Sequence, residues 1–176
     1  MINSKSGQIW VETVIYTLIA IVTITAVLAI AQPKIEEMQD KALIEQSLGV
    51  MNDIDNILIS LAQEGVGNKR VLELGVKDGT FKIDGGNNSL IFEMNSVYMY
   101  SEPGANIFNG KVLIHTKKRG DEFSVNMTQN YSNYNITYDG KDELRIINKA
   151  STPYQLFISN KGKDSSNKII LDFQIE

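Results

Sequence analysis

Few residues of this 176-residue chain could carry out catalysis. The chain has no cysteine, a single histidine (His115) and no glycine-rich phosphate loop. Nucleophilic, metal and nucleotide sites are commonly built from those parts. We therefore predict that the protein is not an enzyme and holds no metal or cofactor. A carboxylate-only enzyme is the one catalytic class that this composition leaves open.

Two short stretches could suggest binding chemistry. Asp139, Asp142 and Glu143 lie close together, but their spacing does not match a calcium loop, so we interpret them as a solvated turn. Residues 119–121 spell Arg-Gly-Asp, a cell-adhesion tripeptide. Because this tripeptide lies between two strand-like runs and Gly-Asp favours a turn, we predict a hairpin tip. His115 follows an apolar run and is predicted to be a strand residue.

Four Asn-x-Ser/Thr triplets could accept N-linked glycans. They begin at Asn87, Asn126, Asn130 and Asn135. A chain rich in Asn, Ser and Thr also produces such triplets by chance. Because only an extracellular surface is modified in this way, the prediction depends on the topology of the chain.

That topology depends on an uncharged apolar stretch, residues 13–33. A helix over residues 8–31 would be about 36 Å long, enough to cross a hydrocarbon core of about 30 Å. No other part of the chain offers a core that could hide it, so we predict a membrane helix. A discarded secretory signal is the alternative, with Ala-Ile-Ala at 29–31 as a loose cleavage site, but such signals have apolar runs of about 7–15 residues.

The residues just before this stretch form a further motif. Lys5-Ser6-Gly7 is followed by Gln8-Ile9-Trp10-Val11-Glu12. With the apolar run, this segment resembles the class III signal of archaeal type IV prepilins. The resemblance implies that a prepilin peptidase cuts between Gly7 and Gln8 and leaves the helix on the mature protein. It also implies that the N-terminus lies in the cytoplasm and that everything after Pro33 lies outside the cell.

Four residues of the long helix are candidates for assembly: Glu12, Trp10, Tyr16 and Pro33. The resemblance implies that Glu12 is the glutamate at mature position five, and a carboxylate in apolar surroundings is costly unless it is paired. The freed amine of Gln8 on a neighbouring subunit would pair with it in a filament. A place at the membrane interface near the positive end of the helix is the alternative. Trp10 and Tyr16 are interpreted first as interfacial aromatics and second as packing groups between filament helices. Because they depart from the residues common in archaeal pilins, the subfamily stays open.

Pro33 closes the apolar segment. It lacks a backbone donor and clashes with the carbonyl of Ala29, so we expect a kink or local melting there. Residues 33–64 nevertheless keep helical periodicity, with apolar side chains opposite acids and amides. We predict an amphipathic stalk whose apolar stripe packs against the following domain, a neighbour's stalk being the alternative. The stripe consists of Ile44, Leu48, Met51, Ile54, Leu58 and Leu61.

From residue 65 the apolar period changes to two, which is typical of strands. Turn sequences such as Asp78-Gly79, Asp139-Gly140 and Asn160-Lys161-Gly162 separate the runs. Short strands at this spacing indicate an antiparallel sandwich or curled sheet. The predicted fold class is therefore α+β, a long N-terminal helix followed by an antiparallel β-rich domain. The predicted strands are 71–76, 80–83, 89–94, 97–100, 111–116, 122–127, 134–138, 143–148, 154–159 and 168–175.

These segments predict four parts: a leader (1–7), a transmembrane and filament-core helix (8–32), the stalk (33–64) and an extracellular β-rich domain (65–176). The resemblance implies a structural subunit of an archaeal type IV pilus-like filament, a homo-oligomer at the cell surface. It also implies a prepilin peptidase, a membrane platform and an assembly ATPase as partners. An archaellin, a minor pilin-like subunit and a non-polymerising single-span protein with an extracellular binding domain are the alternatives. No basic patch indicates nucleic acid.

Overall fold

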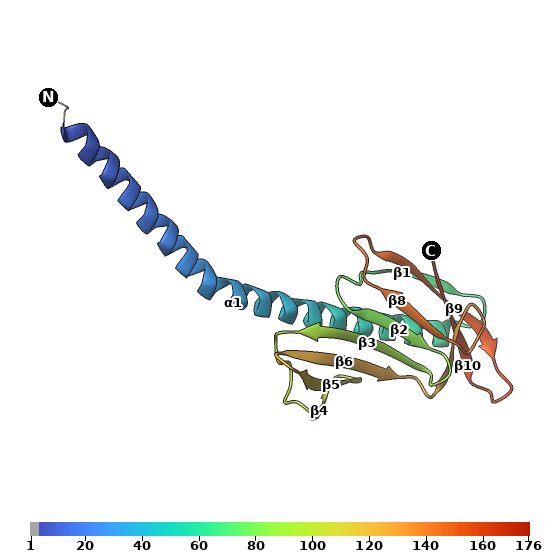
Figure 1. Ribbon diagram of the computed structural model, residues 1–176. Coiled ribbons are helices and arrows are strands. Elements are labelled where there is room, and N and C mark those ends of the chain that lie inside the picture. The colour runs from blue at the N-terminus through green and yellow to red at the C-terminus, as the bar shows by residue number, and fades with distance from the viewer. Residues whose placement is uncertain (1–3) are drawn as a thin grey trace. The chain divides into compact units, whose positions relative to one another are not determined.

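A computed structural model describes the backbone of residues 4–176 and the side chains of residues 9–176 (Figure 1). One long helix, α1 (Ser4–Glu64), is followed by ten strands in this described part of the chain. The chain divides into two compact units, a first unit that ends at Gln39 and a second unit, Asp40–Glu176. The predicted fold class is confirmed, because a long helix with an apolar N-terminal part precedes two largely antiparallel sheets.

The first unit is the N-terminal part of α1. Threonine is a weak helix former because its hydroxyl competes for backbone partners. Here the hydroxyls of Thr13, Thr17, Thr23 and Thr25 each donate to the carbonyl oxygen four residues earlier, over 2.8–2.9 Å, so these polar groups are satisfied within the helix.

The helix continues through Pro33, so the predicted local melting does not occur. Proline removes one donor at this position, and the remaining backbone bonds keep the helix intact.

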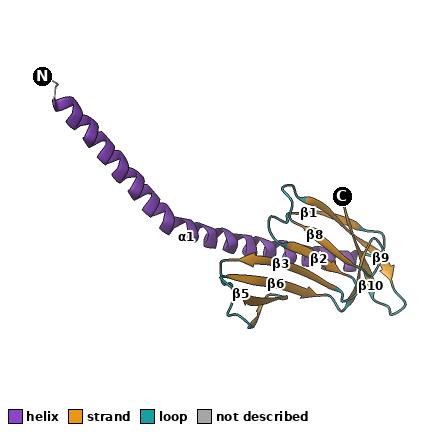
Figure 2. Cartoon of the chain, in the orientation of Figure 1, coloured by secondary structure: helices purple, strands orange, loops and turns teal. Residues whose placement is uncertain are grey.

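The second unit contains two sheets (Figure 2). In the four-stranded sheet β7 (Tyr134–Tyr138) pairs parallel with β10 (Ile169–Ile175), and the other pairs are antiparallel. In the six-stranded sheet all pairs are antiparallel. The four-stranded sheet has the order β1 (Lys69–Leu74), β9 (Tyr154–Lys163), β10 (Ile169–Ile175) and β7 (Tyr134–Tyr138). The six-stranded sheet has the order β4 (Asn106–Asn109), β5 (Val112–Arg119), β6 (Glu122–Asn130), β3 (Ser89–Ser96), β2 (Thr80–Asp84) and β8 (Leu144–Asn148).

The core of the second unit is built around the C-terminal half of α1. All six side chains of the predicted apolar stripe, from Ile44 to Leu61, are buried. They belong to one hydrophobic cluster with inward-facing side chains of both sheets, among them Phe81 and Phe173. The expectation that the stripe packs against the β-rich part is therefore confirmed. The amphipathic half of the helix is a central core element of this unit.

Polar contacts fix the same half of α1 to the sheets and loops. The Asp40 carboxylate accepts a hydrogen bond from the backbone N–H of Val97 over 2.7 Å. Lys111 Nζ lies 2.8 Å from Asp55 Oδ2. Apolar contacts alone do not fix the orientation of α1, because the hydrophobic effect is non-directional. These two polar contacts have a preferred geometry and therefore help to set that orientation.

Between residues 97 and 109 one predicted strand is absent and one observed strand was missed. Residues 97–100 form no strand, because the N–H of Val97 bonds to Asp40 and that of Tyr98 bonds to the Ser96 hydroxyl over 2.9 Å. Their donors are thus engaged by side chains. The short edge strand β4 was not predicted, and its residues 106–109 pair with β5.

The turn predicted at Asn160-Lys161-Gly162 is also wrong. These residues lie inside β9, next to an irregularity in its pairing with β10 between Ile170 and Leu171. Gly162 takes a φ of +99°, which glycine adopts without steric cost. A local bulge therefore replaces the turn. The chain reverses at residues 164–167, where Asp164 Oδ1 accepts the N–H groups of Ser166 and Lys168.

Candidate functional site

The apolar surface of α1 is the first candidate site. Between Ile9 and Ile30 fourteen large hydrophobic side chains are 47–77% exposed. Among the described residues this is the one helix long and apolar enough to cross a membrane. Packed side chains of this kind are buried in soluble domains, so an exposed apolar patch of such length indicates an interaction with lipid or with other apolar helices.

The predicted assembly residues do not form a single cluster on this helix. Glu12 and Tyr16 are four residues apart and share one face, whereas Trp10 lies on a different side. All three side chains are exposed, and Glu12 has no hydrogen bond or ion pair within the described residues. Surrounded by lipid or by other apolar helices, this carboxylate would need a partner from outside the chain. Gly7 and Gln8 lie on the backbone of α1, but the side chains at the proposed processing junction lie outside the described residues.

The four glycosylation candidates differ in accessibility. Asn130 is exposed at the end of β6, and its Oδ1 accepts the N–H of Ser132, which is exposed too. The Asn87 amide donates to the Asp84 carboxylate over 2.7 Å. Asn126 and Asn135 are half-buried strand residues. Asn130 therefore has the most accessible triplet of the four.

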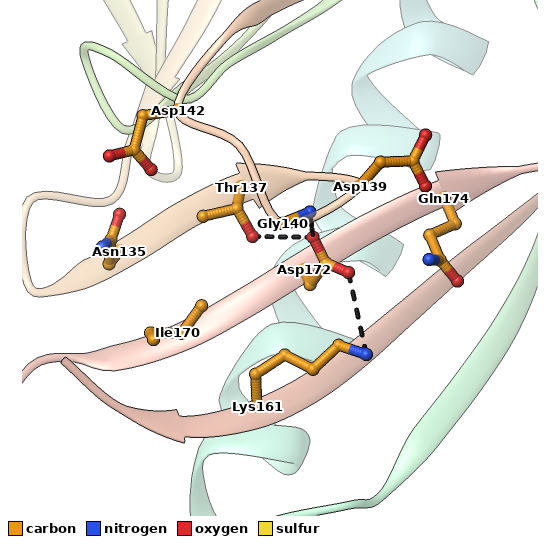
Figure 3. A pocket seen from close by; sticks show the side chains of 9 residues that line it. All are labelled: Asn135, Thr137, Asp139, Gly140, Asp142, Lys161, Ile170, Asp172 and Gln174. Carbon is orange, nitrogen blue, oxygen red and sulfur yellow. Dashed lines mark hydrogen bonds and ion pairs between the residues drawn. The ribbon is translucent and has the colours of Figure 1, made fainter.

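A hollow of about 460 Å³ lies beside the turn that contains Asp139 (Figure 3). Its floor holds the buried carboxylate of Asp172, whose Oδ1 accepts hydrogen bonds from the Thr137 hydroxyl and the Gly140 N–H, each over 2.7 Å. Lys161 Nζ lies 3.9 Å from Oδ2 of the same carboxylate. Asp172 thus joins β10 to the neighbouring strand and to the turn, which is a structural task.

The acidic residues around this hollow do not assemble a metal site. In the described part of the chain no three carboxylate or imidazole groups come together as metal ligands. Asp139 and Gly140 both have positive φ, +50° and +75°, as in a type I′ hairpin turn. Tyr138 and Lys141 exchange backbone hydrogen bonds on either side. The interpretation of this segment as a solvated turn is confirmed.

The Arg-Gly-Asp tripeptide lies at a hairpin tip, as predicted. Arg119 and Glu122 pair at the ends of β5 and β6, with Gly120 and Asp121 between them. Gly120 has φ +65°, and Asp121 is not in the left-handed region. A positive φ at the first central residue alone is the pattern of a type II′ turn, for which glycine is preferred.

A polar row across the six-stranded sheet was not found by sequence analysis. Its members are directly opposite each other on neighbouring strands and lie on the sheet face away from the core. Knowledge of the strand order is needed to recognise it. In spatial order the row is Asn148, Thr80, Glu93, Asn126, His115 and Asn106.

A second unexpected group consists of two buried polar side chains, Gln129 at the end of β6 and Tyr131 just after it. The Gln129 amide and the Tyr131 hydroxyl have no hydrogen-bond partner within the described residues. Burial, together with the nearby charge of Asp55, raises the pKa of the Tyr131 phenol far above its ordinary value. Such groups destabilise the folded state unless they are satisfied. Gln129 and Tyr131 therefore place polar groups in a largely apolar interior.

Comparison of the chain with family models, with curated proteins and with solved structures gives no significant match.

Proposed function

We propose that the protein is a structural subunit of an archaeal type IV pilus-like filament. In this proposal a prepilin peptidase cuts between Gly7 and Gln8, the helix holds the subunit in the membrane, and a membrane platform with its ATPase then assembles the subunits. The apolar helices form the filament core and the second units form its outer surface. The filament lies on the cell surface.

The observation that carries the proposal is the apolar surface of α1. Burying one large hydrophobic side chain stabilises by roughly 1.5–3 kcal/mol, so the fourteen exposed side chains between Ile9 and Ile30 favour leaving water strongly. Lipid can cover this surface before assembly, and helices of other copies can cover it afterwards. The Gly7–Gln8 junction and Glu12 add features that a simple membrane anchor does not need.

The second unit also supports the proposal, because its fold does not depend on the apolar part of α1. Its hydrophobic cluster is closed by residues from Ile44 onward, and no side chain before Asp40 contributes to the described core. The apolar part of α1 is therefore not needed to complete the fold of the second unit. This part of α1 can therefore contact lipid before assembly and the helices of neighbouring subunits afterwards.

Two other functions are consistent with the same helix. An archaellin or a minor pilin-like subunit would be processed in the same way, and its abundance in sheared surface material would separate a minor from a major subunit. A single-span surface protein that never polymerises would keep its function after Glu12→Gln and after replacement of the helix by another apolar sequence.

The N-terminus of the protein recovered from native membranes or sheared surface material tests the proposal. Mass spectrometry should find Gln8 as the first residue. A start at Met1 would favour the non-polymerising anchored domain, and a start after Ala31 would make the apolar stretch a discarded signal. Gly7→Val should block cleavage because the peptidase needs a small residue there, whereas the neighbouring Ser6→Ala should leave it intact.

A further inference from the structure

We propose that the outer face of the six-stranded sheet binds an acidic sugar chain, that is, a polysaccharide that carries carboxylate or sulfate groups. The site is a groove made of two adjoining hollows of about 450 and 90 Å³ that share Glu93 and Arg119. We call it the sheet groove. This inference goes beyond the filament function, because it concerns what the exposed surface of the subunit holds.

The floor of the sheet groove offers hydrogen-bonding groups suited to sugar hydroxyls. Thr80, Asn148 and Asn95 line it, and their side chains have no hydrogen-bond partner within the described residues. Asn126 Oδ1 accepts from the Thr128 hydroxyl over 2.8 Å, which leaves its amide N–H groups to donate. Amides and hydroxyls both donate and accept, as a chain of sugar hydroxyls requires.

The charge of the sheet groove favours an anion. Lys82, Lys117 and Arg119 line it against the single carboxylate of Glu93, although the whole chain has a net charge of −4. Lys82 Nζ is 2.6 Å from Glu93 Oε2, so this pair largely neutralises itself. Lys117 and Arg119 make no ion pair within the described residues. A guanidinium binds carboxylate or sulfate through two parallel hydrogen bonds, which makes Arg119 the expected anchor.

An exposed aromatic side chain lies on the same sheet face. Phe108 is 72% exposed and lies two residues from Asn106 on β4, so both point to the same side of the sheet. It is opposite Leu113, which is next to the polar row. An exposed ring beside hydroxyl-binding groups can cover the apolar C–H face of a sugar.

Other classes of ligand fit the sheet groove less well. Nucleic acid needs many cationic contacts along its phosphates, and here two unpaired cations flank a central carboxylate. A peptide strand would pair with the backbone of a sheet edge, but the sheet groove lies on the outer face of the sheet, across the neighbouring strands β5, β6, β3, β2 and β8. A sugar chain needs neither a free edge nor a long cationic surface.

Calorimetric titration of the full chain in detergent micelles tests the proposal. The probes are a hexamer of galacturonic acid, a sulfated glucose hexamer and an unmodified glucose hexamer. At least one acidic hexamer should bind, and the glucose hexamer should bind much more weakly. The two acidic probes show whether carboxylate or sulfate is preferred. Binding should weaken as NaCl rises from about 0.05 M to about 0.5 M, because exposed charges are screened by salt.

Variants connect binding to the sheet groove. The double change Lys117→Gln and Arg119→Gln should weaken binding of the acidic hexamer by about tenfold or more. Lys118→Gln removes one positive charge from the same strand, but residue 118 points to the other side of the sheet, so binding should not change. Thr80→Val, which keeps the shape of the side chain, should weaken binding several-fold without altering far-UV circular dichroism.

Three results would overturn the proposal: no binding of either acidic hexamer, equal weakening by Lys118→Gln, or tighter binding of a single-stranded DNA dodecamer or a poly-glutamate peptide to the same groove. None of them affects processing at Gly7–Gln8 or filament formation. The sugar-binding proposal and the filament proposal can therefore fail separately.

Discussion

The side-chain amide of Asn160 donates to the carbonyl oxygen of Leu61 over 2.8 Å in the interior of the second unit. Leu61 lies in the last turn of α1, where carbonyl groups lose their helical partners. The Asn160 Oδ1 accepts the N–H of Gly162 over 2.9 Å, at the bulge of β9. One buried side chain therefore satisfies the helix end and the strand irregularity together.

Asn160→Ala should destabilise the second unit by about 1–3 kcal/mol, because it leaves buried donors and acceptors unsatisfied. Urea unfolding followed by circular dichroism measures the change. Gln155→Ala, on the exposed side of the same strand, is the control and should change stability by less than about 0.5 kcal/mol. Equal effects of the two substitutions would show that the Leu61 contact contributes little.

Gly79→Ala should be among the most destabilising small substitutions. Gly79 has φ +75°, and an added Cβ would lie 2.2 Å from the carbonyl oxygen of Glu93. Left-handed strain and backbone overlap together should cost about 2–4 kcal/mol. Gly86→Ala is the matched control, because its nearest contact would be 3.5 Å away and its φ is not positive. A thermal melt in which both variants behave alike would contradict the prediction.

Tyr131 should make stability depend on pH in the alkaline range. Burial raises the pKa of this phenol in the folded state above its value of 10.0 in the unfolded chain. The folded state therefore favours the neutral phenol, so its contribution is complete below about pH 10 and is lost progressively as the pH rises above it. The loss approaches about 1.4 kcal/mol per pH unit.

Tyr131→Phe provides the comparison for this pH effect. The urea midpoints of the two proteins should move apart between pH 8 and pH 11, because the wild type loses more stability than the variant above pH 10. At neutral pH the variant should be at least as stable as the wild type, since it removes a buried hydroxyl that has no partner within the described residues. Parallel pH profiles would mean that the phenol ionises as freely in the folded state as in the unfolded chain.

Glu12→Gln should reduce filament yield by about tenfold or more if the carboxylate pairs with the amine of a neighbouring subunit. Asp53→Asn makes the same change of charge at an exposed position of the second unit and should leave the yield unchanged. Both proteins should still be cut at Gly7–Gln8, as seen by mass spectrometry. A normal yield from Glu12→Gln would assign Glu12 to the membrane interface alone.

If the second unit is glycosylated outside the cell, as the proposed topology allows, Asn130→Gln should remove a glycan mass, because this triplet is the most accessible of the four. Asn135→Gln should remove none, since Asn135 is half-buried and its triplet ends in Thr137, which is buried and bonded to Asp172. Intact-mass measurement of each variant distinguishes the two. Loss of mass only in the Asn135 variant would reverse this assignment.

Sequence patterns within a few residues correctly predicted the buried stripe of α1, one strand and one hairpin tip. The stripe from Ile44 to Leu61 was predicted because helical spacing separates apolar from polar side chains, and it is the buried face of α1. The strand at residues 134–138 and the hairpin tip at Gly120 likewise follow from alternation and turn chemistry.

The errors have long-range causes. Residues 97–100 look like a strand, but Asp40, 57 residues before Val97, takes the donor that a strand would use. β4 has only four residues, too few to show alternation, and is defined by its partner β5. The polar row and the sheet groove depend on the order of six strands, which no local pattern encodes. Glu12 has no partner among the described residues, so no pattern in this chain can identify one.

The placement of the core around the C-terminal half of α1 also determines how the protein responds to proteolysis. A protease that cuts between residues 31 and 39 would release a fragment that keeps all six buried side chains of the stripe. Such a fragment should stay folded and soluble. A cut in the loop at residues 65–68 would instead separate both sheets from their central helix, and the sheets would expose the surface that it covered.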